Sequence, residues 1–192
     1  MKAIVNHRIF FWTLLALPAV AAILSGKDAA DQLHGTGEWS ARLLILALAI
    51  SPLVLVARRA RWTLWLQQRR RYIGVAAFAY AALHTFYYVM DMETLPAILS
   101  EITIISIWTG WLAIIAMLLM ALTSNDASMR WLRAGWKKLQ RLAYPAAILT
   151  LAHWLLIHDG VTAALIHFAP LALLEAYRIA HHLNRRKTPA HA

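Results

Sequence analysis

Residues 69–84 read RRRYIGVAAFAYAALH, and this stretch decides the fold class. Three arginines are followed by an apolar, alanine-rich run that ends in His84. Cations at the start of an apolar segment of helical length are typical of the end of a membrane-spanning helix. A histidine inside such a segment is costly and indicates a functional site.

The rest of the chain repeats this pattern. Of its 192 residues, 61% are apolar, against roughly 45–50% in an average soluble domain. A bilayer core needs about 20 apolar residues in helical form. We therefore expect residues 1–192 to form one all-α integral membrane domain, in which the first segment is a retained helix rather than a signal peptide. Its six transmembrane helices are predicted at Ile9–Ser25, Trp39–Ala57, Tyr72–Met90, Ile102–Thr123, Leu142–Ile157 and Val161–Ala180.

The charged residues predict the orientation. The formal net charge is +10, and all nineteen Lys and Arg residues except Lys27 and Arg42 lie near the termini or in every second connection. Because short cytoplasmic loops accumulate positive charge, we expect both termini in the cytoplasm. The alternate connections, expected outside, carry the acidic residues Asp28, Asp31, Glu38, Asp91, Glu93, Glu101 and Asp159.

Composition also excludes several kinds of site. The cations are separated by apolar runs, so they do not form the continuous solvated surface that nucleic acid requires. Cysteine is absent, which removes disulfides, iron–sulfur clusters and the covalent attachment of a c-type heme. The stretch Gly35-Thr36-Gly37 lacks the third glycine and the preceding strand of a dinucleotide-binding fingerprint.

Two histidines lie at the same depth. His84 follows Tyr72 by twelve residues, and His153 follows Arg141 by twelve. At a rise of about 1.5 Å per residue, each lies about 18 Å into its helix, in the outer half of the membrane. Such a pair is suited to hold one heme b, with an imidazole on each face of the iron, for one-electron transfer. Two buried histidines that only donate hydrogen bonds to carbonyl groups are the alternative.

Three further residues complete the candidate site. His167 lies at a similar depth in the sixth segment, as an alternative ligand or a hydrogen-bond partner. Arg42 lies just inside the outer end of the second segment, where a guanidinium pairs with a heme propionate or with phospholipid. Gly74 and the alanines near it keep the third segment thin, as a cofactor slot requires, although small residues also promote plain helix packing.

Several short motifs occur in the order of a known family. They are residues 69–74 and 78–84, Thr36-Gly37, residues 50–53, residues 122–124 and the segment from Trp136 through Tyr144 to His153. Together they resemble the MsrQ/YedZ family, within the ferric-reductase-like transmembrane superfamily. The resemblance implies a six-helix bundle in the bacterial inner membrane that carries heme b on His84 and His153. It also implies electron transfer from a cytoplasmic flavin reductase, with FMN as a carrier, to a periplasmic molybdenum-containing subunit that reduces methionine sulfoxide.

One position departs from the family pattern. The family usually has a histidine two residues after the position of Lys138, and this chain has Gln140 there. The ligand on the cytoplasmic side is therefore missing, and the resemblance supports one heme rather than two. Two other functions remain open: a ferric or quinone reductase that acts directly at the outer face, and a non-redox transporter or assembly factor.

Overall fold

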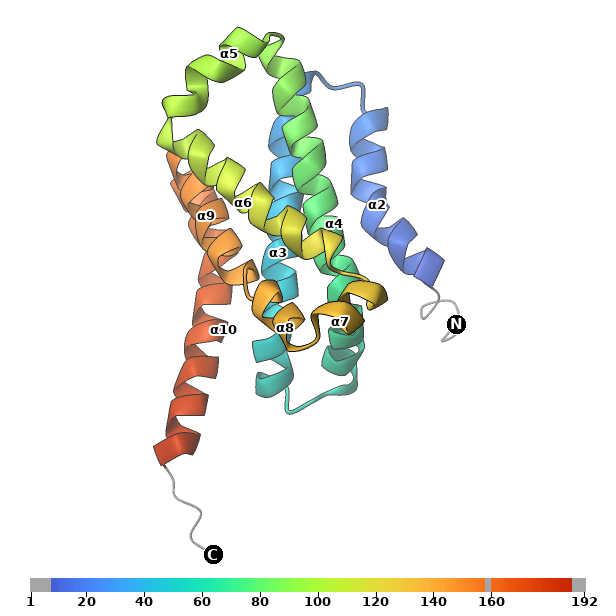
Figure 1. The fold of residues 1–192 in the computed structure, drawn as a ribbon, viewed down its shortest axis with the longest axis vertical. Helices are drawn as coiled ribbons and strands as arrows, with labels where there is room; N and C mark the ends of the chain where they lie inside the picture. The colour runs from blue at the N-terminus through green and yellow to red at the C-terminus, as the bar shows by residue number, and fades with distance from the viewer. Residues whose placement is uncertain (1–7, 158–159, 188–192) are drawn as a thin grey trace, which may run out of the picture.

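The computed structural model describes residues 8–157 and 160–187, and all the regular elements in these ranges are helical (Figure 1). The all-α prediction is therefore confirmed for the described chain. The elements, in order, are α2 (Arg8–Leu24), α3 (Ala29–Val56), α4 (Arg61–Met92), α5 (Leu95–Ser100), η1 (Glu101–Thr103), α6 (Ile105–Leu122), α7 (Asp126–Leu132), α8 (Ala134–Gln140), α9 (Ala143–Ile157) and α10 (Val161–Lys187).

The predicted membrane spans all fall on these helices. By length and composition, α3, α4, α6 and α10 are four candidate membrane spans. The apolar helices α2, with 17 residues, and α9, with 15, are shorter. The six-span arrangement therefore stays a prediction. Both termini, with Lys2, and the outer residue Asp159 lie outside the described residues.

Four helix boundaries differ from the prediction by three residues or more, and one of them is the end of α10, at Lys187 rather than at Ala180. Helix α3 begins well before Trp39 because Asp28 caps it, its carboxylate accepting the backbone N–H of Asp31 at 2.9 Å. Helix α4 begins at Arg61, so the arginines at 69–71 lie within a helix rather than in a loop. Helix α6 begins only at Ile105, because Glu101–Thr103 forms a 3-10 turn.

Two antiparallel helix pairs form the centre of the bundle. Helices α3 and α4 pack most extensively, and α6 packs mainly on α9 (Figure 1). Alanines allow the close approach, since Ala77 of α4 and Ala146 of α9 are fully buried. Helix α10 covers α3 and α9 on one side, and α2 covers α3 and α4 on the other.

A tyrosine attaches α2 to this centre. The hydroxyl of Tyr80, on α4, accepts the backbone N–H of Ala19 at 2.9 Å and donates to the carbonyl oxygen of Leu15 at 2.9 Å. These two backbone groups are partners in the hydrogen-bond ladder of a regular helix. Tyr80 is thus inserted into one turn of α2, next to Pro18.

The fold separates the basic connections from the acidic ones. The α3–α4 connection, with Arg58 and Arg59, lies at the same end of the molecule as α7 and α8 (Figure 1). Helix α5 lies at the opposite end, next to Glu93 and Glu101. We refer to these as the basic end and the acidic end.

Candidate cofactor site

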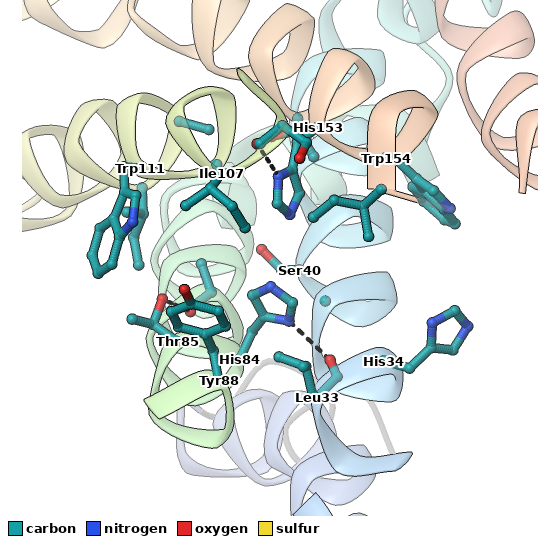
Figure 2. A pocket seen from close by; sticks show the side chains of 18 of the residues that line it. Leu33, His34, Ser40, His84, Thr85, Tyr88, Ile107, Trp111, His153 and Trp154 are labelled. Atoms are coloured by element: carbon teal, nitrogen blue, oxygen red, sulfur yellow. Dashed lines mark hydrogen bonds between the residues drawn. The ribbon is translucent and has the colours of Figure 1, made fainter. Parts of the chain in front are cut away.

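A cavity of about 580 Å³ lies between α3, α4, α6 and α9. Most of its lining is apolar, and His84 and His153 enter it from different helices (Figure 2). Toward the acidic end, its lining includes Glu38, Asp91 and Glu101. A largely apolar cavity of this size with a few convergent polar groups is typical of a cofactor or ligand site.

His84, on α4, is held by the backbone of α3. Its Nδ1 lies 2.8 Å from the carbonyl oxygen of Leu33. Because a carbonyl oxygen only accepts hydrogen bonds, Nδ1 carries the proton and the lone pair is on Nε2. The ring lies over Gly37, where a Cβ atom would come within 2.8 Å of Nδ1. Glycine is therefore the residue that leaves room for the ring.

His153, on α9, is held by α6 in the same way. Its Nδ1 lies 2.7 Å from the carbonyl oxygen of Ser106, so Nδ1 is again the donor. The ring lies over Gly110, where a Cβ atom would come within 2.8 Å of both Nδ1 and Cε1. A hydrogen bond from the second ring nitrogen to a carbonyl is the usual way in which a metal-ligating histidine is oriented.

The two rings face one another across the cavity. Their centres are 6.2 Å apart, and their planes are inclined at 89°. In Figure 2, one nitrogen of each ring is hydrogen-bonded to a carbonyl, and the other nitrogen points toward the opposite ring. Two imidazoles on opposite sides of one metal ion, each with a bond of about 2.0–2.1 Å, have ring centres about 6 Å apart. The pair therefore fits the axial ligation of a single iron.

His167 and Arg42 lie beside this cavity and not in its lining. His167 donates from Nδ1 to the carbonyl oxygen of Ala163 at 2.7 Å, and its Nε2 accepts from Nε of Arg42 at 3.1 Å. The Arg42 guanidinium also pairs with Glu38. Both ring nitrogens of His167 are thus engaged with protein groups. The pairing of Arg42 with a propionate stays a prediction.

Gly74 does not line the cavity either. A Cβ atom at this position would have nothing within 4 Å. The glycines that border the histidines are Gly37 and Gly110, and sequence reasoning did not select them. An isolated glycine inside a helical pattern is the available signal, but the predicted second helix begins at Trp39, after Gly37.

Gln140 connects two helices at the basic end. Its Nε2 donates to the carbonyl oxygen of Met120 at 3.2 Å and to Oγ1 of Thr123 at 3.4 Å, which ties α8 to the end of α6. A carboxamide is not among the usual axial ligands of heme iron. Within residues 8–157 and 160–187, no group of three or more His, Cys, Asp and Glu side chains is arranged to hold a metal ion.

Known proteins are similar to this chain over most of its length. Residues 36–151 match the family described as ferric reductase like transmembrane component. The chain is 32% identical over 174 residues to the protein-methionine-sulfoxide reductase heme-binding subunit MsrQ of Xanthomonas campestris pv. campestris (strain 8004), covering 87% of this chain and 77% of that protein. For the MsrQ protein of Xanthomonas axonopodis pv. citri the identity is 32% over 179 residues, covering 86% and 79%. For that of Azospira oryzae it is 32% over 154 residues, covering 76% and 64%.

No solved structure matches the chain. The apolar helices and the family matches identify a multi-pass membrane protein. The chain therefore belongs to the ferric reductase like transmembrane family and, within it, to the family of MsrQ heme-binding subunits.

Proposed function

We propose that this chain is a b-type cytochrome subunit in which His84 and His153 bind one heme b. The observation that carries the proposal is the pair of facing imidazoles with ring centres 6.2 Å apart. The similar proteins are heme-binding subunits by name. Heme b, when bound, supplies reversible one-electron transfer. Two histidine ligands would leave no coordination position of the iron open, which favours electron transfer over reaction of a substrate at the metal.

The protein orients the ligands and places them in a largely apolar cavity. The hydrogen bonds to Leu33 and Ser106 fix the tautomer of each ring. They also make Nε2 a stronger electron-pair donor to a metal ion. The apolar lining of the cavity, which includes Ala81, Ala113 and Met117, limits the access of solvent. Both effects influence the reduction potential of a bound heme.

We propose six spans with both termini in the cytoplasm of a bacterial cell, in the inner membrane. In this arrangement α2 and α9 cross the membrane together with the four longer helices. The separation of basic and acidic connections to opposite ends of the fold supports this orientation. His84 and His153 then lie nearer the periplasmic side, because the cavity extends to the acidic end.

We propose that electrons enter at the basic end and leave at the acidic end. The donor is a cytoplasmic flavin reductase, with FMN as the carrier, since clustered arginines suit a flavin phosphate. The acceptor is a periplasmic, molybdenum-containing methionine sulfoxide reductase subunit. The names of the similar proteins support a place in that reductase system.

A second candidate is a ferric or quinone reductase that acts at the outer face without a protein acceptor. The observation in its favour is the acidic part of the cavity lining, because Glu38, Asp91 and Glu101 attract cations. The description of the matching family points in the same direction.

One experiment separates the two candidates. The purified, heme-loaded protein is reduced with flavin reductase, NADH and FMN, and its reoxidation is followed optically after addition of an acceptor. We expect fast reoxidation by the isolated molybdenum subunit with methionine sulfoxide, and slow reoxidation by a ferric chelate or a quinone. The reverse order would favour the second candidate, and a colourless protein from heme-replete cells would contradict both.

A further inference from the structure

The two halves of the candidate site repeat one arrangement. On α3, the carbonyl of Leu33 is followed four residues later by Gly37. On α6, the carbonyl of Ser106 is followed four residues later by Gly110. In both cases the histidine of the paired helix lies over the glycine and donates from Nδ1 to that carbonyl.

The glycine is what makes this hydrogen bond accessible. A carbonyl within a helix already accepts the backbone N–H four residues later, and both carbonyls here also accept the hydroxyl of the threonine before the glycine, Thr36 at 3.1 Å and Thr109 at 2.6 Å. An imidazole reaches the same oxygen by lying close to the helix surface, over the residue one turn further along. A Cβ atom at Gly37 or Gly110 would lie only 2.8 Å from Nδ1 of the ring. A methyl group at either position therefore forces the ring to move.

We propose that Gly37 and Gly110 are positioning residues for the two heme ligands. Each seats one imidazole against a helix backbone, and together they hold the ring planes nearly perpendicular, at the observed 89°. This inference rests on the proposed function, in which His84 and His153 are the ligands. The space at each glycine keeps Nδ1–H hydrogen-bonded to a carbonyl. This bond makes Nε2 a stronger electron-pair donor, which would stabilise ferric iron.

Alanine at either glycine has a specific expected effect. The displaced imidazole loses or lengthens its hydrogen bond to the carbonyl, so Nε2 becomes a weaker electron-pair donor to the iron. We expect an upward shift of the midpoint potential and a loss of part of the six-coordinate low-spin signal. The substitution does not destabilise the helix itself, because alanine has a higher helix propensity than glycine.

The chain provides matched controls. Gly35 lies on α3, two residues before Gly37, and Gly74 lies on α4, the helix that carries His84. A Cβ atom at either position would have nothing within 4 Å. Gly35→Ala and Gly74→Ala should therefore retain the wild-type potential and spectrum.

The test compares the wild-type protein with Gly37→Ala, Gly110→Ala and the two controls, each purified with heme bound. The measurements are the electron paramagnetic resonance spectrum of the ferric form and a potentiometric titration. We expect the strongly anisotropic low-spin signal of nearly perpendicular imidazole planes in the wild type. The signal and the potential should change in Gly37→Ala and Gly110→Ala, and in neither control.

Two results would overturn the inference while leaving heme ligation intact. One is a wild-type signal of the rhombic kind that parallel imidazole planes give, a result that requires no variant to fold. The other is a signal and potential in Gly37→Ala and Gly110→Ala that match those of Gly35→Ala. A wild-type protein without heme would instead contradict the proposed function, and the inference with it.

Discussion

The imidazole of His84 stands at 89° to that of His153, with ring centres 6.2 Å apart. Each ring is tied through Nδ1 to a backbone carbonyl of the helix beside it, Leu33 on α3 and Ser106 on α6. The pair is therefore oriented by two separate helix pairs. Its geometry depends on backbone groups and on small residues more than on neighbouring polar side chains.

His167→Ala should leave the spectrum of a bound heme unchanged. The ring of His167 is engaged at both nitrogens, with Ala163 and with Arg42. Loss of a part-buried hydrogen bond of this kind costs about 0.5–1.5 kcal/mol of folding free energy. The measurements are the absorption spectrum and the thermal unfolding of the variant in detergent. Disappearance of the low-spin bands would identify His167 as a ligand.

Arg42→Ala separates a pairing of Arg42 with a propionate from its contacts within the protein. The guanidinium contacts Glu38 and His167, which links α3 to α10. We expect a lower unfolding temperature, because α10 loses this attachment, and little change in the midpoint potential. Potentiometric titration and thermal unfolding of the same preparation separate the two effects. A clear shift in potential at unchanged stability would show that Arg42 acts on a propionate.

Tyr80→Phe should weaken the attachment of α2. Removing the hydroxyl leaves the backbone N–H of Ala19 and the carbonyl of Leu15 without this partner. Loss of a part-buried hydrogen bond costs about 0.5–1.5 kcal/mol, so the unfolding temperature should fall while the heme spectrum stays the same. Tyr87→Phe is the control on the same helix, since the ring of Tyr87 packs on Phe86. Equal stability of the two variants would contradict this role.

Reporter fusions test the six-span topology. Alkaline phosphatase, which is active only in the periplasm, is joined after truncation at successive connections. We expect activity for fusions after Lys27 and Glu93, and none for fusions after Arg59 and Lys137, because basic connections stay in the cytoplasm. Fluorescent protein fused to the C-terminus should fluoresce. An inverted pattern would mean that the protein has the opposite orientation. Activity at two successive connections would mean that the helix between them does not cross the membrane.

The apolar pattern predicted the helices, and counting along it placed the two histidines at one level. The rings of His84 and His153 face one another as expected, although α4 begins at Arg61, before the arginines from which the depth of His84 is counted. Spacing along the chain carries no information on what lies behind each ring. The roles of Gly37 and Gly110 depend on the side-by-side register of two helix pairs, which only the folded structure shows.

The helix ends were harder to predict than the helix centres. The capping hydrogen bond of Asp28 adds polar residues to the start of α3, so His34 and Gly37 lie on a helix and not in a loop. Hydropathy alone places the start at the first continuous apolar residues, near Trp39. The contact of Arg42 with His167 joins α3 to α10, and no local pattern predicts it.

The most direct test of the central claim is the heme content and absorption spectrum of the purified wild-type protein beside those of His84→Ala and His153→Ala. We expect one heme per wild-type chain, in a six-coordinate, low-spin form with two imidazole ligands. We expect loss of that spectrum in each single variant, because each histidine would supply one axial ligand. An unchanged low-spin spectrum in either variant, or a wild-type protein without heme, would contradict it.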